Sequence, residues 1–450
     1  MSDIVVKNGL DIPIAGASSG DVVALPDPET VAYSPTEIRG FTPRVVAREG
    51  DEVKVGSPLL LHKPHPSIVL RSPVAGRVKE IRRGHRRVIT DYIVERHGDA
   101  VASLPSVPAA DIAKLSQAEA IDLAAASGWW PAIRARPLSA MADPTIAPQA
   151  VLIAASETGP LQPSAEHLIE PDDAEALQAA VDLLRAASGV DVHVTRMKGD
   201  DLPAVTGLQR VSHHTFSGPH PAGDPAVQIN LLCPPRGAGV VWFLRAWDAV
   251  SLGHTILSGR FHATRVIAAV GAAVRTPRLV RTLLGAPLRH VVSDAVDGSR
   301  WLRGSVLTGE AVDAERWTGF YSRAVHVLSE EVPRDLFGWA TPQLGKWSFH
   351  KAFLRGFFTP SKPIDMRPGL YGGHRAIVPI GAYEKVVATP DILPEFLFKS
   401  IVAGDLEESI QLGLLDLSEE EAALCSYICP SKIDFDVLLR EGLDLYEQEA

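Results

Sequence analysis

The fold of the N-terminal part of this 450-residue chain is decided by Val45–Ile81, which reads VVAREGDEVKVGSPLLLHKPHPSIVLRSPVAGRVKEI. Gly50 and Gly56 mark turns between short stretches in which apolar and polar residues alternate. The same pattern returns around Gly76, after a Ser-Pro pair. Such alternation indicates short strands with one buried face, so the stretch predicts a small β barrel made of two similar halves.

Two such halves resemble the barrel-sandwich hybrid that carries biotin or lipoate. In those carriers a tight hairpin between the halves lifts one lysine into solvent. Here the linking segment reads His62-Lys63-Pro64-His65-Pro66. The two prolines remove two amide donors and fix two φ angles, so a two-residue turn that presents Lys63 is not expected. We therefore predict the barrel without a cofactor on Lys63.

Composition limits the class of protein. The chain has 44 Lys and Arg against 54 Asp and Glu, and the net charge of −10 argues against nucleic acid as a partner. Val266–Val274 is among the longest apolar runs and is far shorter than the ~18 residues of a membrane-spanning helix. The first residues lack the pattern of an export signal. With three cysteines, a disulfide framework is not expected and a reducing cytoplasm fits.

The pattern along the chain predicts four domains of mixed α/β class. They are a β-rich barrel-sandwich domain at 1–104, a Rossmann-like α/β domain at 105–254, a compact β-grasp domain at 255–330 and a mostly helical domain at 331–450.

Within the α/β domain, alternating strands and helices predict a small parallel sheet. We expect strands at Ala150–Ala155 and Val190–Thr195, with a helix at Asp172–Ala187 between them. Val227–Cys233 predicts a third buried strand. An earlier, Ala-rich helix should run over Ser116–Ser127 and end at the following glycine.

A nucleotide-binding domain needs a glycine-rich turn after its first strand, because only glycine lets backbone amides approach a phosphate closely. Here that turn reads Ser156-Glu157-Thr158-Gly159-Pro160. Pro160 has no amide to offer and the carboxylate of Glu157 would repel phosphate. The sequence therefore predicts the fold without a bound nucleotide.

The pair Cys425 and Cys429, followed by Pro430, is similar to the end of a ferredoxin cysteine run. A cubane cluster needs four thiolates and the chain has three cysteines. With a spacing of four on a helix, which a Ser418-x-x-Glu421 capping box would open, both sulfurs are expected to lie buried on one face. A metal shared between subunits remains the alternative.

The segment Phe216–Gly223, FSGPHPAG, combines two prolines with two glycines. It predicts a rigid, exposed loop that carries one aromatic and one imidazole side chain. Phe216, Gly218, Pro219 and His220 are therefore candidates for a docking surface. The alternative is a purely structural turn.

A basic tip, defined here as Arg82, Arg83, Arg86 and Arg87, stands out on an acidic protein. Four neighbouring guanidinium groups repel one another, so a partner rich in carboxylates or phospholipid phosphates opposite them would explain the cluster. A solvated hairpin end is an equally open alternative.

Several motifs together resemble one family, the A subunit of the bacterial sodium-translocating NADH:quinone reductase. The motifs are Lys7–Gly16, Phe216–Gly223, Pro277–Leu283, Gly372–Glu384 and Cys425–Pro430. They cover the chain nearly end to end, and as a set they are specific.

The resemblance implies a peripheral subunit on the cytoplasmic face of the bacterial inner membrane. The complex oxidises NADH, reduces ubiquinone and exports Na⁺, and it uses flavins (FAD, FMN and riboflavin) and an iron–sulfur centre. The implied partners are the five other subunits, named B to F, chiefly the B subunit in the membrane, together with ubiquinone. The resemblance also implies that 255–330 is of the SLBB type and that 331–450 carries a degenerate iron–sulfur-type fold.

This chain departs from the flavin-binding relatives of that family. Where those relatives have a glycine-rich flavin loop, the corresponding segment here begins Gly128-Trp129-Trp130. Two indoles fill volume where flavin needs bare backbone. We therefore expect a structural, quinone-proximal subunit, with no redox cofactor, metal ligand or catalytic residue of its own, and with Phe216, Gly218, Pro219 and His220 as quinone-side candidates. The alternative is a flavin and iron–sulfur subunit similar to the C subunit of the ferredoxin:NAD reductase.

Overall fold

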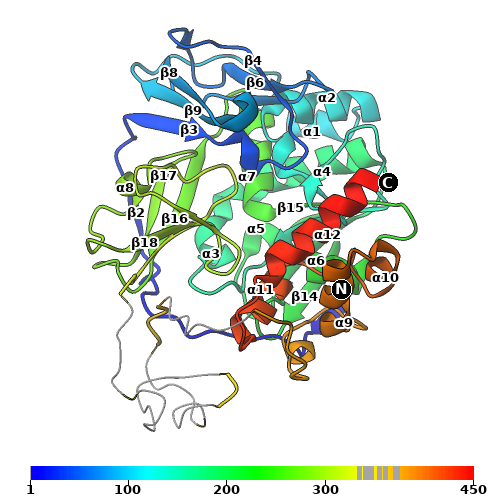
Figure 1. Cartoon of the computed structure of the whole chain (residues 1–450). Coiled ribbons are helices and arrows are strands. Elements are labelled where there is room, and N and C mark those ends of the chain that lie inside the picture. Colours follow the sequence, from blue (N-terminus) through cyan, green and yellow to red (C-terminus); the bar gives the residue numbers. More distant parts are fainter. Residues whose placement is uncertain are drawn as a thin grey trace.

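A computed structural model describes residues 2–331, 337, 349–351, 357, 363–367 and 375–449 of the chain. Figure 1 shows the barrel at the top, a second β sheet on the left, the α/β sheet with its helices on the right, and the C-terminal helices in front of that sheet. The first three residues of the Gly372–Glu384 motif lie outside the described residues.

The barrel consists of two facing sheets whose core includes Leu59, Leu60 and Tyr92. One sheet has the order β3 (Thr30–Tyr33), β9 (Ile89–Arg96), β8 (Gly76–Arg83), β5 (Glu52–Val53), and the other β4 (Pro43–Val45), β6 (Pro58–His62), β7 (Val69–Arg71). The connection from β6 to β7 spans residues 63–68, and Lys63 is exposed within it. The link between the halves is therefore a longer loop than the two-residue turn of a carrier.

The first strands of the chain do not join the barrel. β1 (Ser2–Val5) pairs in parallel with β14 (Ser212–Ser217) at the edge of the α/β sheet. β2 (Val22–Ala24) pairs with β17 (Arg278–Leu283) of the second sheet. The sequence had grouped these strands with the barrel, because alternation shows that a strand exists and not which edge it pairs with. The boundaries at 104, 254 and 330 stay predictions.

The α/β sheet has the order β1-β14-β13-β12-β15-β10-β11. Its remaining strands are β10 (Arg134–Arg136), β11 (Ala140–Met141), β12 (Ala150–Ala155), β13 (Val192–Met197) and β15 (Val241–Arg245). From β12 the chain proceeds outward through β13 and β14, and then returns to place β15 on the other side of β12. The strand order thus reverses between β12 and β15, which makes their carboxyl ends the topological switch point.

Helices cover both faces of this sheet. The longer ones are α2 (Gln117–Ser127), α4 (Ala174–Ser188), α6 (Pro225–Leu232) and α7 (Ala246–Ser258), and the short ones are α1 (Ala109–Ile112), α3 (Ala165–Leu168) and α5 (Pro203–Thr206). α4 and α7 pack so closely that a Cβ on Gly253 would lie 1.8 Å from the carbonyl oxygen of Ala176. As predicted, Ser116 caps α2 in a capping box and the helix ends at Gly128 with a φ of 91°.

The prediction of a strand at Val227–Cys233 is wrong, because this segment forms most of α6. Asp224 caps the helix by accepting from the amide of Ala226, and Pro225 occupies its first turn. A short apolar run fits a buried strand and a buried helix equally well, and here the Asp-Pro start signal decides for the helix.

The second sheet has the order β19-β18-β20-β16-β17-β2. Its other strands are β16 (Thr264–Val270), β18 (Arg300–Arg303), β19 (Glu310–Val312) and β20 (Ala324–Leu328), and one short helix, α8 (Leu288–Val291), packs on it. This sheet lies below the barrel in Figure 1.

The C-terminal part is helical, as predicted, with α9 (Pro394–Ala403), α10 (Leu406–Gln411), α11 (Glu419–Ile428) and α12 (Phe435–Glu449). Ser418 and Glu421 form the predicted capping box of α11, and Cys425 and Cys429 are both fully buried at 0% exposure. Among the residues with described placement, no helix has the length and apolar character to cross a membrane.

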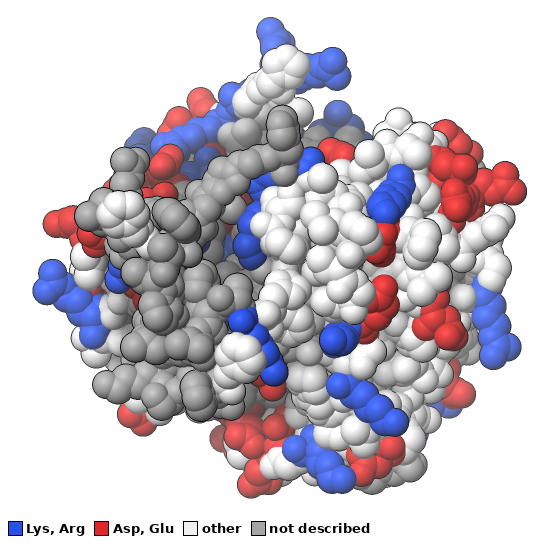
Figure 2. Space-filling view, turned by 60° about the horizontal axis from the view of Figure 1, so that its bottom comes forward, with Lys and Arg blue, Asp and Glu red and all other residues white. Residues whose placement is uncertain are grey.

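Charge is mixed on the face shown in Figure 2. Basic and acidic side chains alternate over its described atoms, and no broad area of one sign is present there. This face therefore lacks the continuous basic surface that nucleic-acid binding requires.

Candidate functional site

A cavity of about 370 Å³ opens at the switch point of the α/β sheet. Glu157 follows β12, Arg245 ends β15, and His220 and Asp224 follow β14. Loops of the second sheet and the start of α11 close the other sides. The cavity, called the charged pocket below, therefore occupies the place where open α/β sheets bind their ligands.

Five arginines line the charged pocket, and four of them have an acidic partner. Arg39 lies 2.5 Å from Asp444, Arg323 2.6 Å from Asp248, Arg303 2.5 Å from Glu310 and Arg245 3.5 Å from Glu157. Arg245 also donates to the carbonyl oxygens of Ser156 and Gly223, at 2.7 and 3.1 Å. These four guanidinium groups are held by the protein itself.

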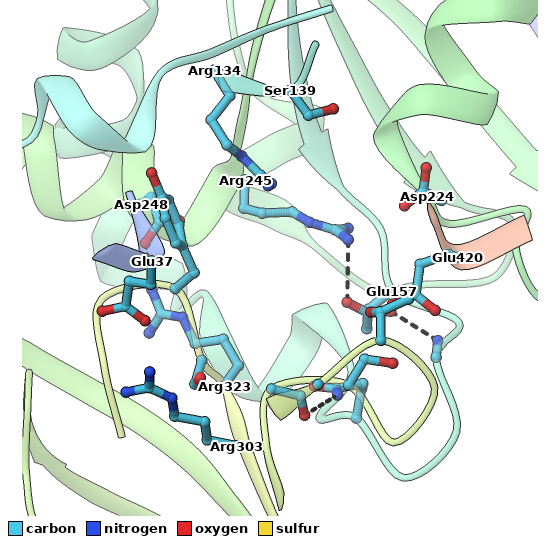
Figure 3. Close-up of a pocket in the computed structure, with 18 of the residues that line it drawn as sticks. Glu37, Arg134, Ser139, Glu157, Asp224, Arg245, Asp248, Arg303, Arg323 and Glu420 are labelled. Carbon is cyan, nitrogen blue, oxygen red and sulfur yellow. Dashed lines mark hydrogen bonds and ion pairs between the residues drawn. The ribbon is translucent and has the colours of Figure 1, made fainter. Parts of the chain in front are cut away.

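The fifth arginine, Arg134, is the exception. Its guanidinium lies over the rings of Phe243 and Tyr321, 4.7 and 5.1 Å from their centroids. Within the described part of the chain it makes no hydrogen bond or ion pair, and its Nε is buried without a partner. Burial lowers the pKa of Arg134, but a guanidinium remains charged in proteins. In Figure 3 its side chain extends into the pocket beside Arg245.

Glu37 lies across the pocket from Arg134 and Arg245 (Figure 3). One of its oxygens accepts the amide of Phe320 at 2.6 Å. Its other oxygen packs on Gly319, where a Cβ would lie 2.3 Å away. Burial raises the pKa of Glu37 to about 7, so this carboxyl group titrates near neutrality.

His220 and Glu420 form a buried ion pair at the rim, with Nε2 and Oε2 3.4 Å apart. The Nδ1 of His220 lies 3.2 Å from the hydroxyl of Thr158, and Thr308 donates to Glu420 at 2.7 Å. Burial alone would lower the pKa of His220, but Glu420 holds it above its ordinary value. Burial would raise the pKa of Glu420, and His220 holds it below its ordinary value.

The turn after β12 is closed by its own side chain. Oε1 of Glu157 accepts the amides of Thr158 and Gly159 at 2.9 and 2.8 Å. In a nucleotide-binding domain these amides face a phosphate. Here a carboxylate of the protein occupies that position, which agrees with the sequence argument against a nucleotide at this turn.

The comparisons with known proteins cover the whole chain. The A subunit of the Na(+)-translocating NADH-quinone reductase of Vibrio atlanticus is 36% identical over 99% of this chain and 100% of that protein. The corresponding A subunit of Photorhabdus laumondii is 34% identical over the same shares. The chain belongs to the NqrA family.

Domain descriptions of the NqrA family match three regions. They are the NqrA N-terminal barrel-sandwich hybrid domain at 4–97, the NqrA second alpha/beta domain at 115–261 and the NQRA C-terminal domain, of SLBB type, at 266–314. These matches confirm the predicted fold class. A chain of an NAD+-reducing [NiFe]-hydrogenase shares 12% identity at a TM-score of 0.38, covering 75% of this chain and 62% of that one.

Family membership confirms the resemblance drawn from the motifs and does not support the alternative of a ferredoxin:NAD reductase C subunit. Among the described residues, no group of three or more His, Cys, Asp or Glu side chains is arranged to hold a metal. Burial raises the pKa of the Cys425 thiol well above its ordinary range, which disfavours the thiolate that a metal needs. Whether this pair shares a metal with another subunit stays an open alternative.

The indoles predicted to block a flavin are fully buried, with Trp129 and Trp130 both at 0% exposure. Trp129 donates to the hydroxyl of Thr255 at 3.1 Å and stacks on Phe261. Trp130 donates to the carbonyl oxygen of Ala142 at 2.8 Å. Both rings are thus part of the core that joins the barrel to the α/β sheet.

The prediction that Phe216–Gly223 is an exposed loop is wrong for its two ring-bearing candidates. Phe216 is fully buried and His220 is 2% exposed. The loop is covered because β1 pairs beside it, and a Cβ on Gly218 would lie 2.1 Å from the carbonyl oxygen of Val6. Gly218 is nevertheless exposed on its other side and Pro219 is partly exposed.

The structure brings only His220 of the predicted candidates into the charged pocket. The basic tip lies at the far end of β8, on the turn that includes the 3-10 helix His85–Arg87, and all four arginines are exposed. Sequence reasoning missed Arg134, Glu37 and Glu420. The one available signal was position, since the pocket residue Glu157 stands just after the predicted strand Ala150–Ala155.

Proposed function

We propose that this chain is the peripheral A subunit of a sodium-pumping NADH:ubiquinone reductase and that it binds no redox cofactor of its own. The named relatives support the complex. NADH oxidation, the flavins, the iron–sulfur centre and the Na⁺ path then belong to the five other subunits, named B to F. The B subunit in the membrane is the main partner, at the cytoplasmic face of the inner membrane.

The observation that carries the absence of a cofactor is the occupied turn after β12. Glu157 uses both amides that a flavin or dinucleotide phosphate would need. A phosphate could enter only by displacing a carboxylate that also lies 3.5 Å from Arg245. The buried indoles of Trp129 and Trp130, in the segment where the flavin-binding relatives have a glycine-rich loop, also support the proposal.

The visible spectrum of the purified full-length chain tests this proposal. We expect no flavin band near ~450 nm and no cluster absorbance, since Glu157 occupies the turn after β12 and three cysteines are too few for a cubane cluster. A stoichiometric flavin or cluster in the purified chain would overturn the proposal. Intact mass, measured on the same sample, checks that Lys63 carries no added group.

We infer that the basic tip docks the chain onto the assembled complex. It stands clear of the barrel core, and only Arg82 has an acidic partner among the described residues, Glu80 at 3.2 Å. Replacing the four arginines of the basic tip with serine should weaken retention of the chain by the membrane complex at moderate salt, and the chain should stay folded. Serine at Arg44 and Arg48, two exposed arginines of the same barrel, is the control.

The chain is further proposed to lie near the quinone. Burial of Phe216 and His220 leaves Gly218 and Pro219 as the accessible part of the predicted quinone-side loop. A photoreactive quinone added to the assembled complex should label this loop or its neighbours. Labelling confined to other subunits would contradict the assignment.

A further inference from the structure

The charged pocket contains an imbalance that the proposed function does not use. Four of its arginines have carboxylate partners within the chain, whereas Arg134 has none among the described residues. The Nε of Arg134 is buried without a partner, while the side chain as a whole is partly exposed to the cavity. A cation that is partly removed from water and has no anion beside it is unfavourable. We therefore expect an anion from the solvent to enter the cavity and pair with Arg134.

Arg134 is also held in position for such an anion. The rings of Phe243 and Tyr321 sandwich its guanidinium from two elements, β15 and the loop before β20. The hydroxyl of Tyr321 is already used, because it donates to the carbonyl oxygen of Pro131 at 2.6 Å. Stacked guanidinium groups keep their edge free, and it is the edge that binds a carboxylate in two parallel hydrogen bonds.

The surroundings limit the charge of the ligand. Six carboxylates line the pocket, including Glu37, Glu157, Asp224 and Glu420, so a dianion such as phosphate would be repelled. The amides that favour phosphate elsewhere in this fold are occupied by Glu157. One negative charge matches the single guanidinium of the pocket that has no anionic partner among the residues the structure describes.

The same carboxylates can accept a proton donor on the ligand. Asp224 caps α6 with one oxygen and has no ion-pair partner in the described part of the chain. Glu37 also lines the cavity, and one of its oxygens has no hydrogen bond to a described residue. A volume of about 370 Å³ suits a small molecule and lies at the lower end of ordinary ligand sites.

We propose that the charged pocket binds a small monocarboxylate bearing a hydroxyl or amino group, with its carboxylate on Arg134 and its donor group toward Glu37 or Asp224. The site lies at the switch point and is separate from the basic tip and the Gly218–Pro219 loop. It requires no redox cofactor and no other subunit.

Ligand binding to the purified full-length chain tests the proposal by thermal shift and calorimetry. Lactate, alanine, propionate, lactamide and inorganic phosphate serve as probes. Saturating lactate or alanine should raise the Tm by about 3 °C. Propionate should raise the Tm less, and lactamide and phosphate should leave it almost unchanged. Whichever of lactate and alanine binds more tightly identifies the donor as hydroxyl or amine.

Three results would overturn the proposal: no acid binds, lactamide binds as well as lactate, or phosphate binds more tightly than every monocarboxylate. Propionate binding as tightly as lactate and alanine would remove the donor requirement. These outcomes are read on the unmodified chain and do not depend on any variant folding.

Variants then locate the site. Arg134→Gln should weaken binding roughly 10- to 100-fold, the loss expected for a charged hydrogen bond, and Arg134→Lys should lose less. Arg185→Gln, at an exposed arginine of α4, should leave binding unchanged. Unchanged affinity in a folded Arg134→Gln variant would reject the assignment to Arg134.

Discussion

The imidazole of His220 lies 3.4 Å from the carboxylate of Glu420, and this pair joins the α/β sheet to the C-terminal helices. His220 follows β14 and Glu420 stands in the first turn of α11. The backbone amide of His220 also donates to Asp11, at 2.9 Å. One buried residue thus connects the N-terminal segment, the α/β sheet and the C-terminal helices.

Replacing Glu420 with Gln should destabilise the chain by about 2 kcal/mol, because His220 loses its counter-charge. The raised pKa of His220 means that its contribution is complete below 6.5 and is lost as pH rises through the folded value. The lowered pKa of Glu420 means that its contribution is present above 4.5 and is lost as pH falls through the folded value. The destabilisation caused by Glu420→Gln should therefore be largest between pH 4.5 and pH 6.5.

Thermal unfolding of Glu420→Gln at pH 6 and at pH 9 measures this difference. Glu407→Gln, at an exposed position in the first turn of α10, is the control and should show no such dependence on pH. An equal loss of Tm for Glu420→Gln at both pH values would show that the pair is not charged in the folded chain.

Replacing Glu157 with Ala should open the turn after β12 to anions. The amides of Thr158 and Gly159 lose their acceptor, which should cost about 1–3 kcal/mol. Millimolar phosphate should then recover part of the lost Tm in the variant and change the parent chain little. Chloride at matched ionic strength is the control. If phosphate does not raise the Tm of the variant, this role of Glu157 is contradicted.

Replacing Glu37 with Gln should stabilise the chain at alkaline pH. Burial raises the pKa of Glu37 from 4.5 to about 7, so ionising this group destabilises the folded state as pH rises between those values. The variant should gain about 1–2 °C in Tm over the parent at pH 8 and little at pH 4. Glu175→Gln, at an exposed glutamate of α4, should show no gain at either pH.

Replacing Arg136 with Ala should loosen the C-terminal helices from the α/β sheet. This fully buried arginine donates through Nη2 to the carbonyl oxygens of Leu415 and Asp416, at 2.6 and 2.8 Å. The loss should reach about 3 kcal/mol, because both carbonyl oxygens lose a charged donor and a fully buried side chain is removed. The midpoint of urea unfolding measures it, with Arg185→Ala, which loses one exposed hydrogen bond, as the control.

Local patterns predicted most of the elements correctly. The strand Ala150–Ala155 and the helix ends at Ser116 and Gly128 are where the sequence placed them, since caps and apolar periods act over a few residues. The failure at Val227–Cys233 has the same origin, because an apolar run of that length carries no period that separates helix from strand.

The sequence by itself determined the barrel at Val45–Ile81, the family, and the presence of the Glu157 carboxylate in the turn after Ala155. Turn residues, apolar alternation and the set of motifs along the chain can all be read without knowing the fold. Only the tertiary structure decided that β1 covers Phe216, that His220 meets Glu420, and that Arg134 is left without a partner among the described residues. Those relationships join residues up to hundreds of positions apart. Whether a charge is paired depends on which strands and loops converge at the switch point, and no local pattern records that convergence.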